Sequence, residues 1–391
     1  MKLKTKLLIK DTILATLFTS LLILCVSFLF INISFFDPIS KTLKDFSFLD
    51  VYYSENFNAT NTVSQDIIII NIEQRDRFEI AQLLETIKAE EPKVIALDII
   101  FKEQREQFID SMLANALQGD NIINSYLIKE DNVIANHDIF NNSGKKGFIN
   151  LNFDDKTNVI RKFASQKEIN NNKHYSFASQ VAQSFSDSNW KENNFDKKLS
   201  QENTIKFHGD YTTFLTFGFD EFMQNNNKAL LKDKIILLGY LGTPTGDIND
   251  VEDKHFTPLN KVTAGKSNPD MFGIVVHANI INMLINNDFM YSVSTIWIGI
   301  ITFLFTFLGI MYFIWVEDRI TTVQFFTLKK IVLFLFTVIL MWISLWFFKM
   351  DIILKTAPII GITLAACSFI AYYKYVFRYI QKRTKWKNYF Q

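Results

Sequence analysis

Four long segments of the chain are almost free of charged residues. A helix that crosses a lipid bilayer needs about 20 consecutive apolar residues, and each segment approaches or exceeds that length. The pattern predicts spanning helices at residues 13–33, 294–315, 331–348 and 356–373. Between the first and second of these, residues 34–293 mix polar and apolar positions as a water-exposed domain does. We therefore predict one globular domain with one membrane helix before it and three after it.

The first apolar segment, Ile13–Ile33, has a second interpretation as a cleaved signal peptide. Signal peptides have an apolar core of about 7–15 residues and a cleavage site with small residues. This segment is longer, and the sequence that follows it, Asn32–Pro38, contains no such site. We expect an uncleaved membrane anchor.

The region 34–293 alternates short apolar runs with amphipathic stretches, which predicts an α/β fold. Buried strands are expected at Asp66–Glu73, Lys93–Phe101, Asn121–Ile128 and Lys234–Gly239, and helices at Phe78–Glu91 and Gln104–Leu117. In the second helix the predicted apolar stripe is Phe108, Met112 and Ala116. Strand–helix–strand repeats at this spacing favour right-handed crossovers. We predict a three-layer domain with a largely parallel or mixed sheet, in which the first, second and fourth strands are central neighbours.

Three further elements complete the predicted domain. A hairpin is expected around Asp154 and Asp155, with strands at Gly147–Phe153 and Val159–Phe163. Tyr175–Phe185 is expected to be a helix and Thr204–His208 a strand.

The distribution of Lys and Arg predicts how the chain crosses the membrane. Four lysines lie in the first ten residues, and more basic residues lie in the loop 316–330 and in the tail 374–391. The positive-inside rule places these segments in the cytoplasm, with residues 1–12 forming the cytoplasmic N-terminus. The domain then lies outside, in the periplasm or on the extracellular side, and the chain is a multi-pass protein of the inner (cytoplasmic) membrane.

The domain's charge narrows the choice of partner. Residues 34–293 contain 26 Lys and Arg against 36 Asp and Glu, a net charge of about −10. An acidic surface repels nucleic acid and anionic lipid headgroups. We therefore expect no nucleic acid as a partner.

Motifs for catalysis and for cysteine chemistry are missing from the sequence. The two cysteines, Cys25 and Cys367, both fall in apolar segments, so the domain has neither a disulfide nor a cysteine-based zinc site. There is no G-x-S-x-G, no H-E-x-x-H and no phosphate-binding loop. We predict that the chain is not an enzyme and has no cofactor. An extracytoplasmic hydrolase is the weakest alternative.

Several motifs occur in the order that a known family shows. The strand Lys234–Gly239 is followed by an acidic loop, by His255–Leu259, and by the apolar run Phe272–Asn279 before a span. Upstream, a Gly-Phe strand leads through an acidic turn to Ile160 and Arg161. This arrangement resembles the CHASE2 domain, an extracytoplasmic sensor module of bacterial signalling proteins. Between the first strand and helix, where such domains often have a Trp/Pro-rich, Arg-bearing segment, this chain has only Arg75 and Arg77.

The resemblance implies a role in signalling. In the family, the last span usually leads into an output domain, whereas only about 18 residues follow residue 373 here, fewer than a domain needs. We expect a non-catalytic sensor subunit that passes an extracytoplasmic signal through its spans to a separate protein. The alternative is a structural or assembly subunit of a cell-envelope complex. Expected partners are other membrane or envelope proteins, an unknown small ligand, and a second copy of the chain.

Five residues are candidates for binding a ligand. Asp98 lies near the carboxyl end of a buried strand, where open α/β sheets bind ligands; the alternative is a cap or turn role. Asp247 and Asp253 belong to the acidic loop, which either contacts a ligand, binds a cation or is simply solvated. Thr257 follows in the segment that resembles the family. His277 is either structural, bonded to a carbonyl or capping a helix that starts near Ala278, or a pH sensor. We expect Asp98, Asp253, Thr257 and His277 to lie together at one edge of the sheet.

The tail 374–391 interleaves six basic residues with aromatic ones. Such a segment anchors at the lipid headgroups or docks a cytoplasmic protein. The sequence leaves both interpretations open.

Overall fold

The computed structural model describes residues 2–32, 63–130, 132–141, 144–154, 158–186, 199–224, 228–247, 249–260, 268–383 and 389. The chain divides into a membrane unit, Met1–Leu43 with Tyr291–Gln391, and a domain unit, Lys44–Met290. The predicted start of the domain, residues 34–62, lies outside the described residues, as does most of the tail after residue 383.

A seven-stranded sheet forms the centre of the domain unit, in the order β11-β1-β12-β2-β3-β4, with β5 also paired to β3. Its strands are β1 (Ser64–Asn71), β2 (Val94–Leu97), β3 (Ile122–Lys129), β4 (Asn132–Ile134), β5 (Lys145–Phe148), β11 (Phe214–Phe217) and β12 (Ile235–Gly239). All pairings are parallel except β3 with β4. The predicted mixed sheet is confirmed, and β12 lies between β1 and β2 as expected.

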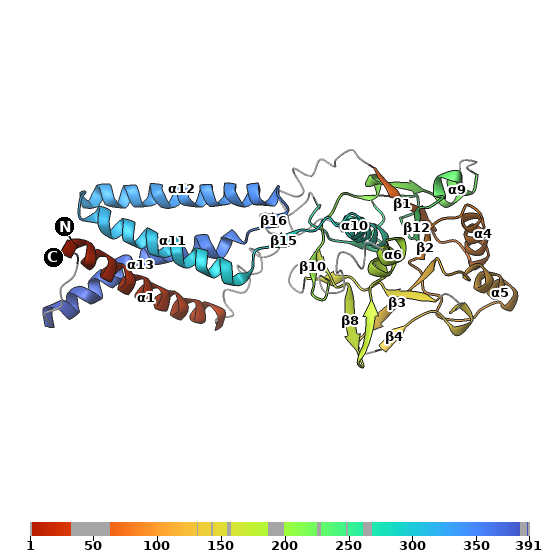
Figure 1. Ribbon diagram of the computed structural model, residues 1–391, viewed down its shortest axis with the longest axis horizontal. Helices are drawn as coiled ribbons and strands as arrows, with labels where there is room; N and C mark the ends of the chain where they lie inside the picture. Colours follow the sequence, from red (N-terminus) through yellow and green to blue (C-terminus); the bar gives the residue numbers. More distant parts are fainter. Residues whose placement is uncertain are drawn as a thin grey trace. The chain divides into compact units, whose positions relative to one another are not determined.

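Helices cover both faces of this sheet (Figure 1). On one face lie α4 (Arg77–Lys88) and α5 (Gln107–Ala116), and on the other α6 (Phe177–Phe185) and α10 (Gly273–Ile285). Because both faces are covered, the four residues of β2 are all buried, and β12 is apolar and buried along its whole length. The three-layer architecture predicted from the sequence is therefore confirmed.

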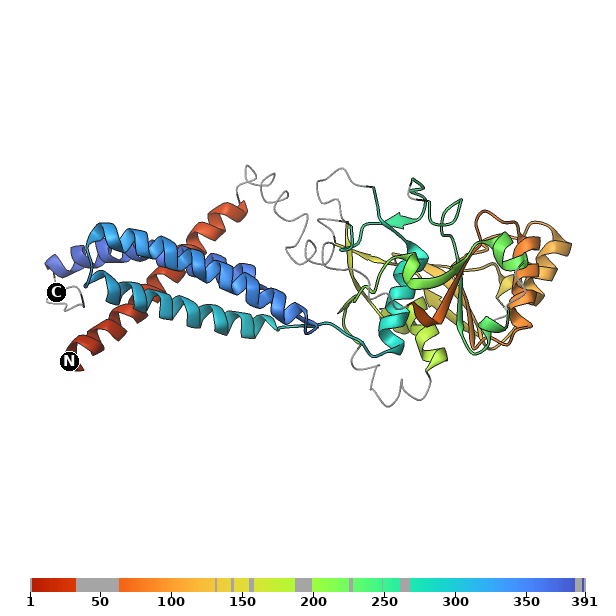
Figure 2. The same ribbon diagram turned by 90° about the horizontal axis from the view of Figure 1, so that it is seen from above.

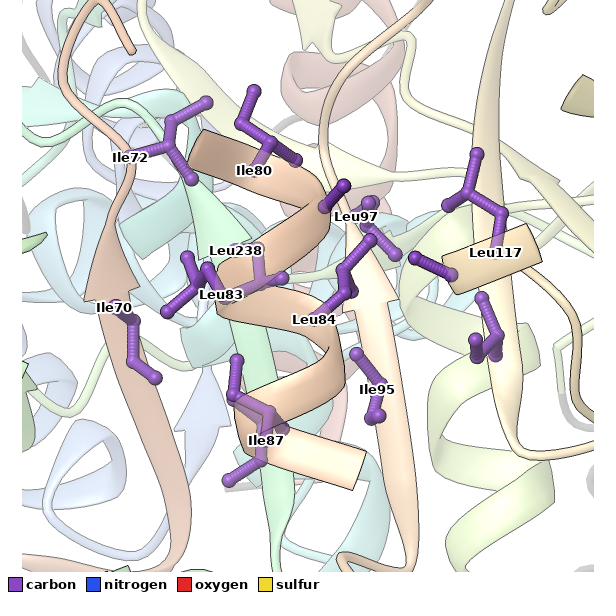
Figure 3. Packing of buried hydrophobic residues seen from close by; sticks show 14 of the residues in the cluster. Ile70, Ile72, Ile80, Leu83, Leu84, Ile87, Ile95, Leu97, Leu117 and Leu238 are labelled. Atoms are coloured by element: carbon purple, nitrogen blue, oxygen red, sulfur yellow. The ribbon is translucent and has the colours of Figure 1, made fainter. Parts of the chain in front are cut away.

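Apolar side chains of the sheet and of α4 form a core between these two layers. Alternate strand residues point to the same face, so Ile70, Ile95 and Leu238 from three strands meet Leu84 and Ile87 of α4 (Figure 3). The helix begins at a capping box in which the side chain of Asp76 accepts the backbone N–H of Glu79.

Two details of the predicted helices are wrong. The expected apolar stripe of the second helix included Phe108, which is 75% exposed, whereas Asp110 is fully buried. Asp110 forms an ion pair with Arg77 of α4. The buried side of α5 therefore contains Asp110, Leu113 and Ala114. The second error concerns α10, which starts at Gly273. His277 therefore lies inside the helix and does not cap one that starts near Ala278.

Short elements complete the domain unit. The predicted strand 204–208 is only β10 (Asn203–Thr204), which pairs with β7 (Ile160–Phe163), and β7 also pairs with β6 (Asn152–Phe153). The others are β8 (Gln166–Ile169), β9 (Asn172–Tyr175), β13 (Lys254–His255), β14 (Met271–Phe272), α9 (Phe219–Gln224), η2 (Asp138–Phe140), η3 (Tyr211–Thr213) and η4 (Lys228–Leu231).

The membrane unit contains four helices long and apolar enough to cross a bilayer: α1 (Lys2–Asn32), α11 (Thr295–Glu317), α12 (Thr322–Phe348) and α13 (Thr356–Arg383). Helix α1 packs against α11 and α13 and crosses them obliquely (Figure 2). The short strands β15 (Tyr291–Ser292) and β16 (Ile352–Ile353) pair before α11 and α13. The helices extend into the predicted loop 316–330, since only residues 318–321 separate α11 from α12.

One end of the membrane unit carries ion pairs between its helices. Lys4 of α1 contacts Asp318, which follows α11, with Nζ and Oδ2 2.6 Å apart. Lys374 of α13 pairs with Glu317 of α11. Tyr389 in the tail is buried, and its backbone N–H donates to the carboxylate of Asp11 in α1. These contacts connect the chain ends to the same end of α11.

Candidate functional site

Asp98 directly follows β2, at the carboxyl edge of the sheet. Its backbone N–H donates to the carbonyl of Leu238 at 2.8 Å, so the backbone is held by the neighbouring strand β12. The side chain is partly buried. Burial raises the pKa of Asp98 to about 7, and the nearby carboxylate of Asp253 adds to the rise. Near neutral pH, a small change in surroundings therefore changes the charge of this carboxyl group.

Asp253 approaches from the loop before β13. Its backbone is left-handed, with φ of 54°, a conformation that Asp tolerates better than most residues. Glycine at the start of α10 leaves room for this approach, because a Cβ at Gly273 would lie 3.1 Å from Oδ2 of Asp253, a tight contact. Oδ1 lies 3.7 Å from Nε2 of His255. The carboxylate thus sits beside the amino end of α10, where the helix dipole favours negative charge.

His277 lies in the second turn of α10 and is only 4% exposed. Burial lowers its pKa to about 4 and His255 adds to the decrease, while the charge of Asp253 and a hydrogen bond to the backbone of Ile149 act against it. Its Nδ1 is buried without a hydrogen-bond partner among the described residues. The imidazole is therefore neutral at physiological pH and packs edge-on against Phe177.

We call Asp98, Asp253, His255 and His277 the acid–imidazole cluster. The structure brings together three of the residues predicted from the sequence, since both Asp98 and His277 interact electrostatically with Asp253. The cluster joins the carboxyl end of β2 to the amino end of α10. Chemically, the cluster contains a carboxyl group with a pKa of about 7 and a buried imidazole nitrogen with no hydrogen-bond partner among the described residues.

The other two predicted residues make contacts elsewhere. Thr257 is buried, and its backbone N–H and hydroxyl both donate to the carboxylate of Asp270. Asp247 accepts the backbone N–H of Asn249 at 2.8 Å, and its carbonyl accepts Nζ of Lys254. Both residues therefore hold the loop in shape, and neither contact reaches Asp98 or His277.

Asn71, at the carboxyl end of β1, is a buried polar residue that the sequence interpretation missed. Its amide donates to the carbonyl of Gly242 at 2.7 Å and to the hydroxyl of Thr245. Its oxygen accepts the N–H groups of Leu241 and Glu73. Asn71 thereby fixes the glycine-rich turn after β12. An asparagine closing an otherwise apolar strand was the signal available in the sequence.

A cleft of 640 Å³ was also missed. It opens where β1 and β2 end, between the first turns of α4 and α5. Its lining includes Arg75 and Arg77, together with Asp110. The sequence shows the two arginines, but their grouping with Asp110 depends on how α5 is turned about its axis. Among the described residues, no three His, Cys, Asp or Glu side chains are arranged to hold a metal ion.

The pKa of Asp98 leads to a prediction for the variant Asp98→Asn. A raised folded-state pKa means that the folded protein holds the proton more tightly, so Asp98 costs stability as pH rises from about 4 to about 7. The variant removes that cost. In full-length protein in nanodiscs, we expect nearly equal stability at about pH 4 and a gain of a few kcal/mol at about pH 8, since each unit of pKa shift is worth about 1.4 kcal/mol. His277 contributes a pH dependence of the opposite sign, because its lowered pKa costs stability as pH falls from 6.5 to about 4. The measured quantity is therefore the difference between variant and wild type in chemical unfolding. A difference that does not change with pH would contradict the burial of this carboxyl.

Comparison with known proteins identifies the family. The family model for the CHASE2 domain matches residues 18–312. No match was found among curated proteins or solved structures. The matched region includes the whole sheet, the acid–imidazole cluster and parts of α1 and α11. CHASE2 is a family of extracytoplasmic sensor domains, and this chain belongs to it.

Proposed function

We propose that the chain is a non-catalytic sensor that detects a signal at the acid–imidazole cluster and passes it through its membrane helices to a separate protein. One observation carries the proposal. Asp253 and His255 of the cluster lie beside Gly273 at the amino end of α10, and residues 286–294 join the carboxyl end of α10 to α11. Helices are stiff, so a ligand that displaces Gly273 or His277 displaces the segment that enters the membrane.

The energetics of the cluster support this role. A ligand shifts an equilibrium only if it binds two states differently. Ionisation of Asp98 next to Asp253 places two negative charges near one helix end. A cationic or hydrogen-bond-donating ligand would relieve that repulsion, and proton loss would increase it. Either event favours one position of α10 over another.

The proposed orientation places the domain outside the inner membrane, with both chain ends inside. Ser188 and Asn388 would report on the two sides of the membrane, but both lie outside the described residues. Lys173 in the β8–β9 hairpin and Thr322 at the start of α12 are exposed substitutes. In a background lacking Cys25 and Cys367, an impermeant thiol reagent added to spheroplasts should label Lys173→Cys and leave Thr322→Cys unlabelled. The reverse pattern would overturn the orientation.

The separate partner is tested by purification from native membranes. Tagged full-length protein, solubilised gently, should bring down at least one other membrane protein in a constant ratio. A matched preparation of Asp98→Asn tests the sensor role, because a sensor variant should change the amount or activity of the partner. A partner present in equal amount and with equal activity in both preparations would favour an assembly subunit, and protein that purifies alone would refute the proposal.

A further inference from the structure

The cleft between α4 and α5 is separate from the acid–imidazole cluster. Its apolar wall includes Ile72, Ile80, Ile99 and Ile109, and its cationic side chains are Arg75, Arg77, Lys102 and Arg105. The residues after β1 and β2 form one side of it. This is the edge of an open α/β sheet at which ligands bind, and its volume of 640 Å³ falls within the range of small-molecule sites.

Arg77 is held rigidly at this cleft. Its Nη1 donates to Oδ1 of the fully buried Asp110 at 2.6 Å, and its Nη2 donates to the carbonyl of Glu103 at 2.7 Å. The guanidinium also lies over the ring of Phe140, 5.2 Å from its centre. The side chain is 12% exposed. Its orientation is therefore set before any ligand arrives, which reduces the entropy lost on binding.

Arg77 has N–H donors that form no hydrogen bond among the described residues. A guanidinium has five N–H donors, and Arg77 uses two of them among the described residues. Both oxygens of its partner Asp110 already accept hydrogen bonds, Oδ1 from Arg77 and Oδ2 from the backbone N–H of Arg105. Arg75 differs, since its guanidinium already donates to Glu73, Glu79 and Asp220. By the hydrogen bonds among the described residues, Arg77 keeps three donors unused and Arg75 keeps one.

The remaining charges around the cleft are mostly engaged or exposed. Asp76 accepts the N–H of Glu79, and Glu103 accepts Nε of Arg105. Glu106 precedes α5 without capping it through its side chain and is exposed at the rim. Lys102 is exposed on the same rim. Unused donors therefore lie next to an apolar wall, and the carboxylates nearest to Arg77 are already bonded.

We propose that this cleft binds a small organic anion, whose carboxylate or phosphate group contacts Arg77 and whose apolar part lies on the isoleucine wall. A planar guanidinium matches a carboxylate or phosphate through two parallel hydrogen bonds. This proposal does not depend on the proposed sensor role, so the experiment measures ligand binding directly.

The test uses three probes that share one apolar body: 2-naphthoate, 2-naphthyl phosphate and the neutral 2-naphthamide. Full-length protein in nanodiscs is titrated by ligand-observed NMR, with empty nanodiscs as the blank. The wild type should bind at least one of the two anions and bind the amide about tenfold more weakly or worse. Tighter binding of 2-naphthoate would indicate a carboxylate site, and tighter binding of 2-naphthyl phosphate would indicate a phosphate site. Equal binding of the amide, or no binding of either anion, would overturn the proposal.

Variants locate the contact. Arg77→Lys keeps a cation beside Asp110 but loses the planar fork, and it should weaken anion binding about tenfold. Arg161→Lys is the matched control, because Arg161 lies in β7 and does not line the cleft, and it should bind as the wild type does. If Arg77→Lys does not fold, Ile109→Trp decides the question by filling the cleft without changing a charge. Unchanged binding in Arg77→Lys or in Ile109→Trp would place the anion elsewhere.

Discussion

Replacing Leu237 with Asp should prevent the domain from folding. Leu237 is fully buried in β12, the strand between β1 and β2, on the sheet face covered by α6 and α10. A carboxylate there loses its hydration inside an apolar core. The desolvation cost is several kcal/mol per ion, on top of the lost packing of a leucine at about 2–5 kcal/mol. Together these approach the total stability of a typical domain, about 5–15 kcal/mol.

The readout is the amount of full-length protein in membranes and its resistance to protease. Leu230→Asp is the matched control, because Leu230 is 50% exposed and the same substitution there should be tolerated. Accumulation of Leu237→Asp at the control level, with equal protease resistance, would mean that β12 is not a central strand.

Replacing Asp110 with Ala should destabilise the domain by about 3–5 kcal/mol, the usual cost of leaving one member of a buried ion pair without its partner. Asp110 is fully buried, and its two oxygens accept Arg77 and the backbone N–H of Arg105. The substitution leaves Arg77 with an unpaired charge at 12% exposure. Chemical unfolding of the purified protein measures the loss.

Two further variants separate the ion pair from general damage to α5. Asp220→Ala removes another carboxylate that contacts an arginine, but Asp220 is 65% exposed, so its loss should cost no more than about 1 kcal/mol. The double variant Arg77→Met with Asp110→Leu removes both charges and should recover most of the stability lost in Asp110→Ala. A double variant no more stable than Asp110→Ala would show that the ion pair is not the cause.

The layers of the domain were predictable because each strand carries its own signal. Four to eight apolar residues between turns, as in β1 and β12, indicate a strand buried on both faces. The helix α4 was equally clear, since Asp76 and Glu79 form a capping box directly before an apolar stripe. These are local patterns, and tertiary contacts reinforced them.

The predicted positions that failed depended on contacts distant in sequence. Phe108 looked like a core residue because the pairing of Asp110 with Arg77, 33 residues away, cannot be read from a helical pattern. Likewise, Gly273–Asn279 is apolar enough for a strand or a helix, and only its packing on α6 and β12 decides.

The residues of the candidate site also divide into those that local patterns indicated and those that depend on contacts distant in sequence. Asp98 and His277 were named as candidates from their places at the ends of apolar runs, and Asp253 from its loop, and a role in ligand binding stays a prediction for all three. Thr257 was grouped with them, but it bonds to Asp270, 13 residues later in the chain. The cleft at Arg77 could not be predicted, since a cavity depends on where side chains from several elements leave space.

The central claim is that the acid–imidazole cluster is coupled to the membrane helices. The direct measurement is a distance distribution by double electron–electron resonance between spin labels at Lys6 in α1 and Thr322 in α12, both exposed, in full-length protein in nanodiscs. Asp98→Asn, which mimics the protonated carboxyl, should shift this distribution relative to the wild type at about pH 8, where Asp98 is mainly ionised. The control Asp247→Asn, in the loop outside the cluster, should leave it unchanged. Identical distributions in the wild type and a folded Asp98→Asn would contradict the account.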